Sequence, residues 1–404
     1  MSDHRAQATA HDAADPLAPL REHFVLDDTV YLDGNSLGAL PRAVQDRLAD
    51  VVAREWGELR IRSWTESDWW TAPERIGDRI APLIGAAPGR VVVGDSTSVN
   101  IFKAVVAGVR MAGRGCTEIL VDATTFPTDG YIARSAARMT GLAVRPVEPA
   151  RIADEVTERT ALALVNHVDY RTGRLNDLPA ITTALHSAGA LAVWDLCHSA
   201  GALPVGLDAH GVDLAVGCTY KYLNGGPGAP AYLYVRESLQ ERFDSPLPGW
   251  NSHTEPFGME PDYAPADGIV RGRVGTPDIL SMLALEAALG VWDGVAIEDV
   301  RTKSLALSDF FLDCVAAYVP AGRVRSTTPS EHRRRGSQVS LECADAGEVM
   351  AELTRRGVVG DHRPGVLRFG FTPLYTSFAD VERAARVLGE ILRERPEAEA
   401  GAGG

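Results

Sequence analysis

The chain has 404 residues, of which 45% are hydrophobic and 23% are charged, and its formal net charge is −14. This composition is typical of a globular protein with one large and one smaller domain, and the negative charge argues against binding to nucleic acid backbones. No apolar run approaches the roughly 20 residues of a membrane-spanning helix, and the first residues do not resemble a secretion signal. The five cysteines are scattered and form no CxxC pair, which predicts a cytoplasmic protein without a zinc site.

Lysine is scarce in this sequence. The 40 basic residues include only Lys103, Lys221 and Lys303, and the other 37 (40 minus 3) are arginine. An arginine cannot form an imine with an aldehyde, because its guanidinium stays protonated. The three lysines are therefore the only side chains that could carry imine chemistry.

Short apolar runs alternate with helix-like stretches through the middle of the chain. Four runs typical of buried strands are Val91–Val93, Glu118–Val121, Ala161–Val165 and Leu191–Trp194. Such alternation is typical of an α/β fold with a mostly parallel sheet covered by helices. After Gly275-Thr276-Pro277 a helical pattern continues to about Tyr318, and mixed strands and helices follow, which predicts a second, smaller α/β domain.

These changes of pattern divide the chain into five parts. We expect residues 1–20 to be disordered and residues 21–60 to pack against the smaller domain. Residues 61–285 are predicted to form the large domain and residues 286–392 the small one. The tail, residues 393–404, is rich in Glu, Ala and Gly and is also expected to be disordered.

The first of three loops that suggest a ligand follows the run at Val91–Val93. Three hydroxyl residues, Ser96, Thr97 and Ser98, precede a helix-like stretch. The N-terminus of a helix offers free N–H groups and partial positive charge, which suit a phosphate. The alternative is that one hydroxyl only caps the helix. Neither a Gly-x-Gly-x-x-Gly nor a Gly-Lys-Ser/Thr pattern is present, which argues against dinucleotide and Walker-type sites.

The second and third loops each follow a predicted strand. Asp195 ends one strand, with His198 three residues later, and Lys221 follows the next strand, beside Gly225-Gly226-Pro227-Gly228. Acids at the ends of parallel strands point into the ligand crevice of an open α/β sheet. The alternatives are a helix cap for Asp195, a structural histidine and an exposed lysine. Lys103 and Lys303 lie in helix-like apolar surroundings that suit structural roles.

Together the three loops have the chain order of an aminotransferase-like enzyme that binds pyridoxal 5′-phosphate (PLP). A hydroxyl-rich turn would hold the phosphate, a carboxylate would keep the pyridine nitrogen protonated, and a lysine would bind the aldehyde. The lysine lies 26 positions after the acid (221 minus 195). Each loop is weak evidence alone, and the combination predicts a PLP site.

Several longer motifs resemble the kynureninase family over residues 24–392. They are YLDGNSLG (31–38), IRSW (61–64), DSTSVNIFK (95–103), FPTD (126–129), WDLCHSAGA (194–202), GCTYKYLNGGPG (217–228), PGW (248–250), GTP (275–277), RGSQVS (335–340) and RFGFTPLYTSF (368–378). The resemblance implies a fold type I PLP enzyme with a seven-stranded, mostly parallel sheet, and a homodimer with active sites at the subunit interface.

The resemblance also implies the role of each site residue. Lys221 would bind the cofactor and later remove the substrate Cα proton, and Asp195 would bind the pyridine nitrogen. Tyr220 would lie beside the cofactor, and its phenol makes it our candidate for assisting the proton transfers. The other residues implied around the cofactor are Thr97, Ser98, Phe126 (stacked on the ring), Asp129, Asn166, His198, Trp250 and Thr276. The residues implied at the substrate are Arg368 (on its α-carboxylate), Trp64, Asn35, Ser36, His253 and Thr276.

The implied reaction is hydrolytic cleavage of the Cβ–Cγ bond of a kynurenine to an anthranilate and L-alanine, in tryptophan catabolism, NAD biosynthesis or a biosynthetic branch. Trp64 and Thr276 are the bacterial-type residues and favour L-kynurenine over its 3-hydroxy form. Structural roles remain the alternatives for Trp64 and Arg368. Asn251-Ser252 departs from the Phe-Gly of bacterial relatives, which suggests either a ring-substituted substrate or a change at the rim.

Two other functions stay open at this point. One is a β-eliminating or desulfurase enzyme of the same fold, although none of the five cysteines lies in an evident catalytic loop. The other is a non-catalytic PLP-binding protein.

Overall fold

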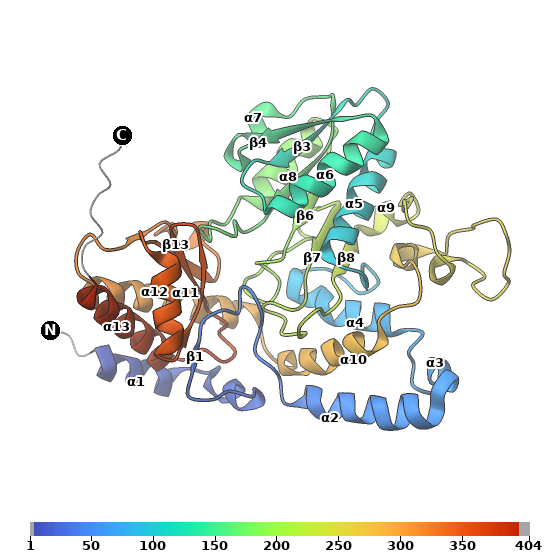
Figure 1. The fold of residues 1–404 in the computed structure, drawn as a ribbon. Helices are drawn as coiled ribbons and strands as arrows, with labels where there is room; N and C mark the ends of the chain where they lie inside the picture. The colour runs from blue at the N-terminus through green and yellow to red at the C-terminus, as the bar shows by residue number, and fades with distance from the viewer. Residues whose placement is uncertain (1–3, 396–404) are drawn as a thin grey trace.

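The computed structural model describes residues 4–395. Figure 1 shows two bodies joined by long segments, one built on a seven-stranded sheet and a smaller one built on a four-stranded sheet. A further two-stranded pairing joins β1 (Val30–Tyr31) to β11 (Val358–Val359). Among the described helices none is by itself long and apolar enough to cross a membrane; Ile279–Trp292 and Ile297–Tyr318, bent by 81°, pass that test only as a pair.

The large sheet has the order β2-β8-β7-β6-β5-β3-β4. Its strands are β2 (Val91–Val93), β3 (Glu118–Asp122), β4 (Ala143–Val147), β5 (Thr160–Asn166), β6 (Leu191–Asp195), β7 (Leu214–Gly217) and β8 (Tyr232–Val235). Strand β8 runs antiparallel to both of its neighbours, and the remaining pairs are parallel. This confirms the expected mostly parallel, seven-stranded sheet.

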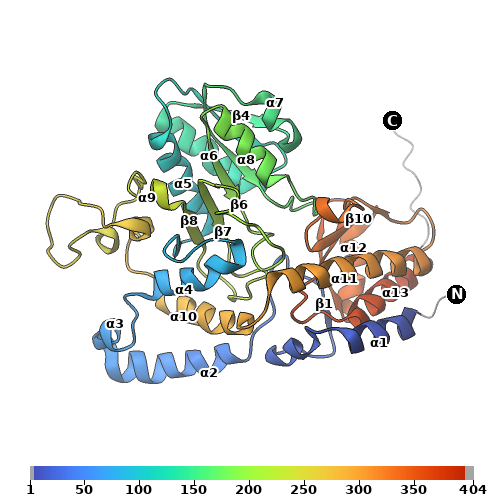
Figure 2. The ribbon, with the colours of Figure 1, turned by 180° about the vertical axis from the view of Figure 1, so that it is seen from behind.

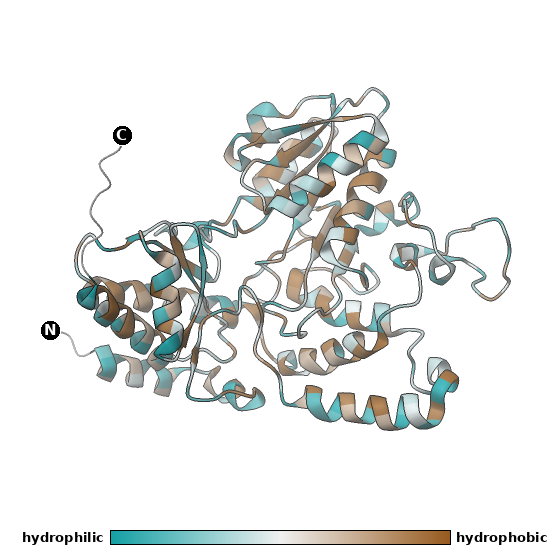
Figure 3. Cartoon of the chain, viewed as in Figure 1, coloured by the Kyte–Doolittle hydropathy of each residue, from teal (hydrophilic) through white to brown (hydrophobic). Residues whose placement is uncertain are grey.

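Helices cover both faces of this sheet (Figures 1 and 2). Along β5, Leu162 and Leu164 join one hydrophobic core, whereas Ala163 and Val165 join the other, because successive strand residues point to opposite faces. A strand buried on both sides reads as a continuous apolar run, and Figure 3 shows these strands as strongly hydrophobic. The covering helices are α4 (Ala72–Ile80), α5 (Thr97–Met111), α6 (Pro127–Thr140), α8 (Leu178–Ser187) and α10 (Ile279–Ala288).

Parallel register brings the ends of the central strands to one edge. Asn166, the last residue of β5, pairs with Asp195, the last residue of β6, and Asp195 pairs with Val216 of β7. Lys221 follows β7 by a few residues. The loops that the sequence singled out therefore meet at the carboxyl edge of the sheet, where ligands bind in open α/β folds.

The smaller body contains its own hydrophobic core. Its sheet has the order β12-β13-β10-β9 and is antiparallel throughout. The strands are β9 (Arg325–Ser326), β10 (Gln338–Glu342), β12 (Asp361–Arg363) and β13 (Val366–Gly370), and the helices are α11 (Ile297–Tyr318), α12 (Ala346–Arg355) and α13 (Phe378–Glu394). The sheet places Arg368 of β13 toward the large body.

The expectation of disorder is wrong for residues 4–20. Helix α1 (His4–Ala14) lies along α13, and the Asp12 carboxylate accepts hydrogen bonds from two backbone N–H groups at the start of α13. Asp15 then forms a 2.6 Å ion pair with Lys303, and both side chains are buried. Composition could not reveal these long-range partners. At the other end α13 reaches Glu394, and residues 396–404 of the predicted disordered tail lie outside the described residues.

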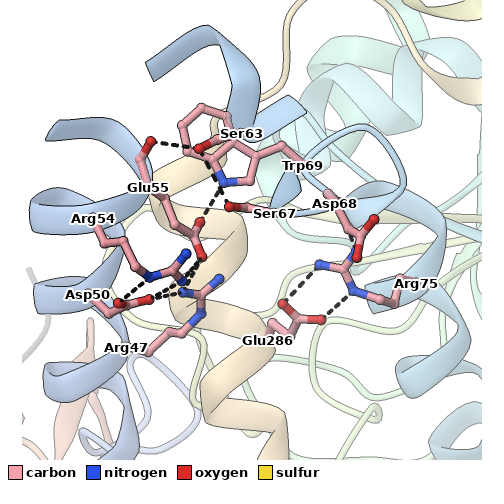
Figure 4. A network of polar contacts seen from close by, with 10 residues as sticks. All are labelled: Arg47, Asp50, Arg54, Glu55, Ser63, Ser67, Asp68, Trp69, Arg75 and Glu286. Atoms are coloured by element: carbon pink, nitrogen blue, oxygen red, sulfur yellow. Dashed lines mark hydrogen bonds and ion pairs between the residues drawn. The ribbon is translucent and has the colours of Figure 1, made fainter. Parts of the chain in front are cut away.

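Residues 21–60 divide between the two bodies, which differs from the expectation. Strand β1 pairs with the small body, but α2 (Ala43–Asp50) and its π-helical continuation, η2 (Val51–Leu59), run along α10 of the large body. We call residues 43–70 the arm, and Figure 4 shows the polar network that holds it. Buried Glu55 accepts hydrogen bonds from Arg47 at 2.8 Å and from the Trp69 indole at 2.6 Å.

We expect Asp15→Ala to destabilise the protein by about 3 kcal/mol, because it leaves the Lys303 ammonium buried without its carboxylate. Urea unfolding of the two proteins checks this. Adding Lys303→Met should restore part of the loss, since no buried charge then remains. A single variant as stable as the parent would show that the N-terminal helix is not anchored by this pair.

Candidate active site

A cavity of about 270 Å³ opens at the carboxyl edge of the large sheet, against the small body. Most predicted site residues line it: Asn35, Ser36, Thr97, Ser98, Phe126, Asp129, Asn166, Asp195, His198, Tyr220, Lys221 and Arg368. They come from segments up to 333 positions apart (368 minus 35). Their meeting in one cavity is the first requirement of a shared site.

Two carboxylates lie on either side of one amide in the floor of the cavity. Asn166 donates from Nδ2 to Asp195 at 2.9 Å and to Asp129 at 3.3 Å. The backbone N–H of Cys197 donates to the other oxygen of Asp195 at 2.7 Å. Burial, followed by the charge of Asp195, raises the pKa of Asp129 well above its usual range. Asp129 therefore tends to keep its proton.

The amine of Lys221 lies within the same cavity, 3.3 Å from Nε2 of His198. Burial, then the positive charge of Lys221, lowers the pKa of His198 well below its usual value, so this histidine is neutral and can accept a hydrogen bond from the lysine. The loop at residues 34–38 packs directly on the lysine backbone, and the N–H of Gly38 donates to the Tyr220 carbonyl at 2.8 Å. A Cβ at Gly38 would overlap the Lys221 carbonyl, which explains the glycine in that motif.

The hydroxyl-rich turn lies at the start of α5. Ser96 is the N-cap, and its hydroxyl accepts from the Val99 N–H, so the capping alternative holds for that residue. Thr97 and Ser98 lie in the first turn and line the cavity, where helical N–H groups have no intrahelical partner. Asp95 has a positive φ of 56°, and buried Lys103 forms a 2.8 Å ion pair with it. The ion pair of Lys103 therefore holds Asp95, the residue that precedes the hydroxyl-rich turn, in place.

The opposite wall carries an aromatic pair and an arginine. Phe126 is 43% exposed, and its ring meets Tyr170 edge-on with centroids 5.3 Å apart. Arg368 is 1% exposed and donates from Nη1 to the Tyr170 carbonyl at 2.6 Å. Tyr170 and Arg363 also line the cavity, although sequence reasoning missed both. Arg363 lies on β12, the strand that pairs with the strand of Arg368. This pairing is the feature that could have identified Arg363 as a neighbour of the site.

Four predicted residues lie outside this cavity. Trp64 and Trp250 belong to one aromatic group, with ring centroids 6.4 Å apart; Trp64 is half-buried and Trp250 is 38% exposed. His253 follows in the same loop. Thr276 is exposed and lines a neighbouring cavity of about 490 Å³, which shares Thr97, Ser98 and Tyr220 with the first.

The unusual Asn251 has a structural role in this chain. Its side chain is 2% exposed, accepts a hydrogen bond from Arg273 at 3.1 Å and donates to the Gly275 carbonyl at 3.3 Å. It therefore joins the loop of Trp250 to the loop of Thr276. Asn251 does not line the cavity that holds Lys221.

Comparisons with known proteins identify the family. A model of the kynureninase C-terminal domain matches residues 300–388. A kynureninase from Deinococcus radiodurans is 49% identical over 397 residues, covering 96% of each chain, and one from Burkholderia pseudomallei is 47% identical over 396 residues, covering 96% of this chain and 95% of its own. The chain belongs to the kynureninase family. This confirms the resemblance drawn from the motifs.

Solved structures show the same fold at lower identity. A cysteine desulfurase from Thermococcus onnurineus NA1 superposes with a TM-score of 0.78 at 19% identity, covering 93% of this chain and 98% of its own. The Escherichia coli cysteine desulfurase CsdA gives 0.80 at 20% identity, covering 94% and 99%. These likenesses support the fold type I architecture expected for kynureninases. Within residues 4–395 no group of three or more His, Cys, Asp or Glu side chains could hold a metal ion.

We expect Asp129→Asn to stabilise the cofactor-free protein increasingly as the pH rises. A carboxyl whose pKa is raised on folding stabilises the fold below its unfolded pKa, and this contribution is lost as the pH rises through the folded pKa, at about 1.4 kcal/mol for each pKa unit. Urea unfolding at pH 4, 6 and 8 checks the trend, with Asp46→Asn on an exposed helix position as control. A difference that stays constant with pH would contradict the shift.

Proposed function

We propose that this protein is a PLP-dependent kynureninase, which cleaves the Cβ–Cγ bond of L-kynurenine with water to give anthranilate and L-alanine. The observation that carries the proposal is the near-complete family match combined with a single cavity that gathers Lys221, Asp195 and Arg368. The neighbouring cavity of about 490 Å³ also has a lysine, an acid and a buried arginine (Lys103, Asp95 and Arg273), but Lys103 is 1% exposed and its amine is engaged by Asp95 at 2.8 Å.

The cavity fits PLP in its three chemical parts. The first turn of α5 offers N–H groups and the hydroxyls of Thr97 and Ser98 for a phosphate. Asp195, fixed by two N–H donors and lying beside a second carboxyl, suits a positively charged ring nitrogen. Lys221 supplies the amine that condenses with an aldehyde. Phe126 presents its exposed ring as a face on which a heterocycle stacks.

When bound, PLP supplies an electron sink that makes the Cα proton of the substrate acidic. Lys221 holds the cofactor before the substrate arrives and then removes the Cα proton as a free amine, with neutral His198 beside it as an acceptor. The charge of Cys218 and burial raise the pKa of the Tyr220 phenol. The phenol therefore stays protonated at neutral pH and acts as a hydrogen-bond donor, and we assign it the proton transfers because it lines the same cavity as Lys221.

The substrate end of the cavity selects an amino acid. Buried Arg368 binds the α-carboxylate, since a planar guanidinium can contact both oxygens. Asn35 and Ser36 line the wall beside it. We assign L-kynurenine rather than its 3-hydroxy form, on the bacterial-type residues Trp64 and Thr276. Asn251 is held by Arg273 and Gly275, but it also lines the neighbouring cavity beside Thr276, so a ring-substituted substrate stays the alternative.

We further propose a homodimer in which Trp64, Trp250, His253 and Thr276 contribute to the site of the partner subunit. Two features support it. The arm that carries Trp64 and the loop after Trp250 project from the large body in Figure 1, and they expose large apolar side chains, such as Trp56 at 59% and Phe257 at 72%. Exposed aromatic patches are typical of protein interfaces. The five free cysteines fit a cytoplasmic protein, with a small-molecule substrate and no nucleic acid or membrane partner.

The decisive experiment is a product assay of the purified holoenzyme. We expect L-kynurenine to yield anthranilate and L-alanine in equal amounts, more efficiently than 3-hydroxykynurenine, and L-cysteine to release no sulfide. Borohydride reduction should attach the cofactor covalently to Lys221. Lys221→Arg should abolish this labelling and lower the turnover by at least about 10³-fold, because arginine cannot form the bond. Release of sulfide from L-cysteine, with no alanine formed from kynurenine, would favour a desulfurase. A label on another lysine would refute the assignment of Lys221.

Mixing two inactive variants tests the dimer. We expect Lys221→Ala and Trp64→Ala homodimers each to lose most turnover. After subunit exchange, hybrids that receive both defects in one site carry an intact second site, so activity should reappear. A mixture that stays as inactive as its components, with exchange verified by mass spectrometry, would place Trp64 outside the partner's site.

A further inference from the structure

An acid faces the substrate-binding arginine across a β-hairpin. Asp361 of β12 is the register partner of Arg368 of β13. The Arg368 guanidinium donates from Nη2 to Asp361. Because both residues are on paired strands of the small sheet, their mutual position is set by backbone hydrogen bonds and not by a mobile loop.

The same carboxylate also holds a second arginine. Arg363, two residues further along β12, donates from Nη1 to Asp361 at 2.8 Å. The hydroxyl of Ser36 donates to the other oxygen at 3.4 Å. Arg363, Arg368 and Ser36 all line the cavity, whereas Asp361 does not. Asp361 thus lies behind the groups that face the ligand.

The hydrogen bonds of Arg368 leave part of its guanidinium available. An arginine has five N–H donors in a rigid planar fork. One goes to the Tyr170 carbonyl and one to Asp361, while Nε is buried without a partner among the described residues. The two fixed bonds determine the plane of the fork, and the remaining donors can meet a carboxylate.

Two arginines and two carboxyl groups meet at this wall of the cavity. Burial opposes ionisation of Asp361, but Arg368 and then Arg363 outweigh it, and the pKa of this carboxyl is lowered. The two guanidinium groups face both Asp361 and Asp33, and burial raises the pKa of Asp33 to about 6, so this group carries a net positive charge only while Asp33 keeps its proton. Arg363 is 36% exposed in its side chain, so it can move toward a bound ligand without leaving Asp361.

We propose that Asp361 is a positioning residue that orients Arg368, and that Arg363 is a second binding group for the α-carboxylate of the amino acid substrate. The inference rests on the proposed function and deepens it. The carboxylate site is then a two-arginine clamp organised by one acid, in place of a single arginine.

The test compares Asp361→Asn and Arg363→Gln with the parent holoenzyme. Binding of L-alanine, followed by the change in cofactor absorbance, should weaken about 10- to 100-fold in each variant, as expected when a positioned guanidinium is lost or misplaced. The KM for kynurenine should rise similarly, with kcat within about threefold of the parent. Bound cofactor per subunit should stay unchanged and both variants should stay folded at the assay temperature, although Asp361→Asn lowers the unfolding midpoint because buried Arg368 then lacks its carboxylate. Asp361→Glu should restore part of the alanine affinity.

Two controls make the result specific. Glu352→Gln removes a half-buried acid that pairs with two arginines elsewhere in the small body, and it should leave alanine binding unchanged. The amine corresponding to kynurenine without its carboxylate should inhibit parent and variants equally. Alanine binding unaffected in both variants would overturn the proposal, as would equal weakening of the carboxylate-free amine. Because alanine binding needs no turnover, a parent enzyme that fails to cleave kynurenine would refute the proposed function separately.

Discussion

Two carboxyl groups buried around a single amide govern the chemistry of this site. Asp129 and Asp195 both contact Nδ2 of Asn166, and water is largely excluded from both. Two like charges so placed cannot both be stable in a low-dielectric environment, so Asp129 tends to keep its proton. A ligand that brings its own positive charge to Asp195 relieves this conflict. The preference for a protonated heterocycle is therefore built into the protein before any cofactor binds.

The fold supplies this arrangement through strand register. Asn166 and Asp195 end adjacent parallel strands and are paired residue to residue, so their side chains cannot separate without loss of the sheet. Arg368 comes from a different, antiparallel sheet in the small body. The catalytic floor is thus rigid within one body, whereas the carboxylate-binding wall belongs to the other. Movement between the two bodies would change the distance between Arg368 and the substrate carboxylate, and it would leave the contacts among Asp129, Asn166 and Asp195 unchanged.

The parts of the site that follow strands were predictable from sequence, because each motif combines a local apolar run with the polar residue after it. Lys221, Asp195 and Thr97 are of this kind. Residues whose importance depends on distant partners were not predictable. The helix at residues 4–14 is ordered by α13 and Lys303, and Asn251 acquires its role from Arg273. Asp361 was missed because only the hairpin register reveals its contact with Arg368.

The distribution of amines has a practical consequence. Lys103 is 1% exposed and Lys303 7% exposed, each engaged by an aspartate, which leaves the cavity lysine as the side-chain amine that small reagents can reach. Mild acylation with a chromophoric ester should then report how many cavities are vacant. In most proteins such labelling is obscured by dozens of surface amines, but here, apart from the α-amino group, the remaining basic side chains are mostly arginine, which does not react.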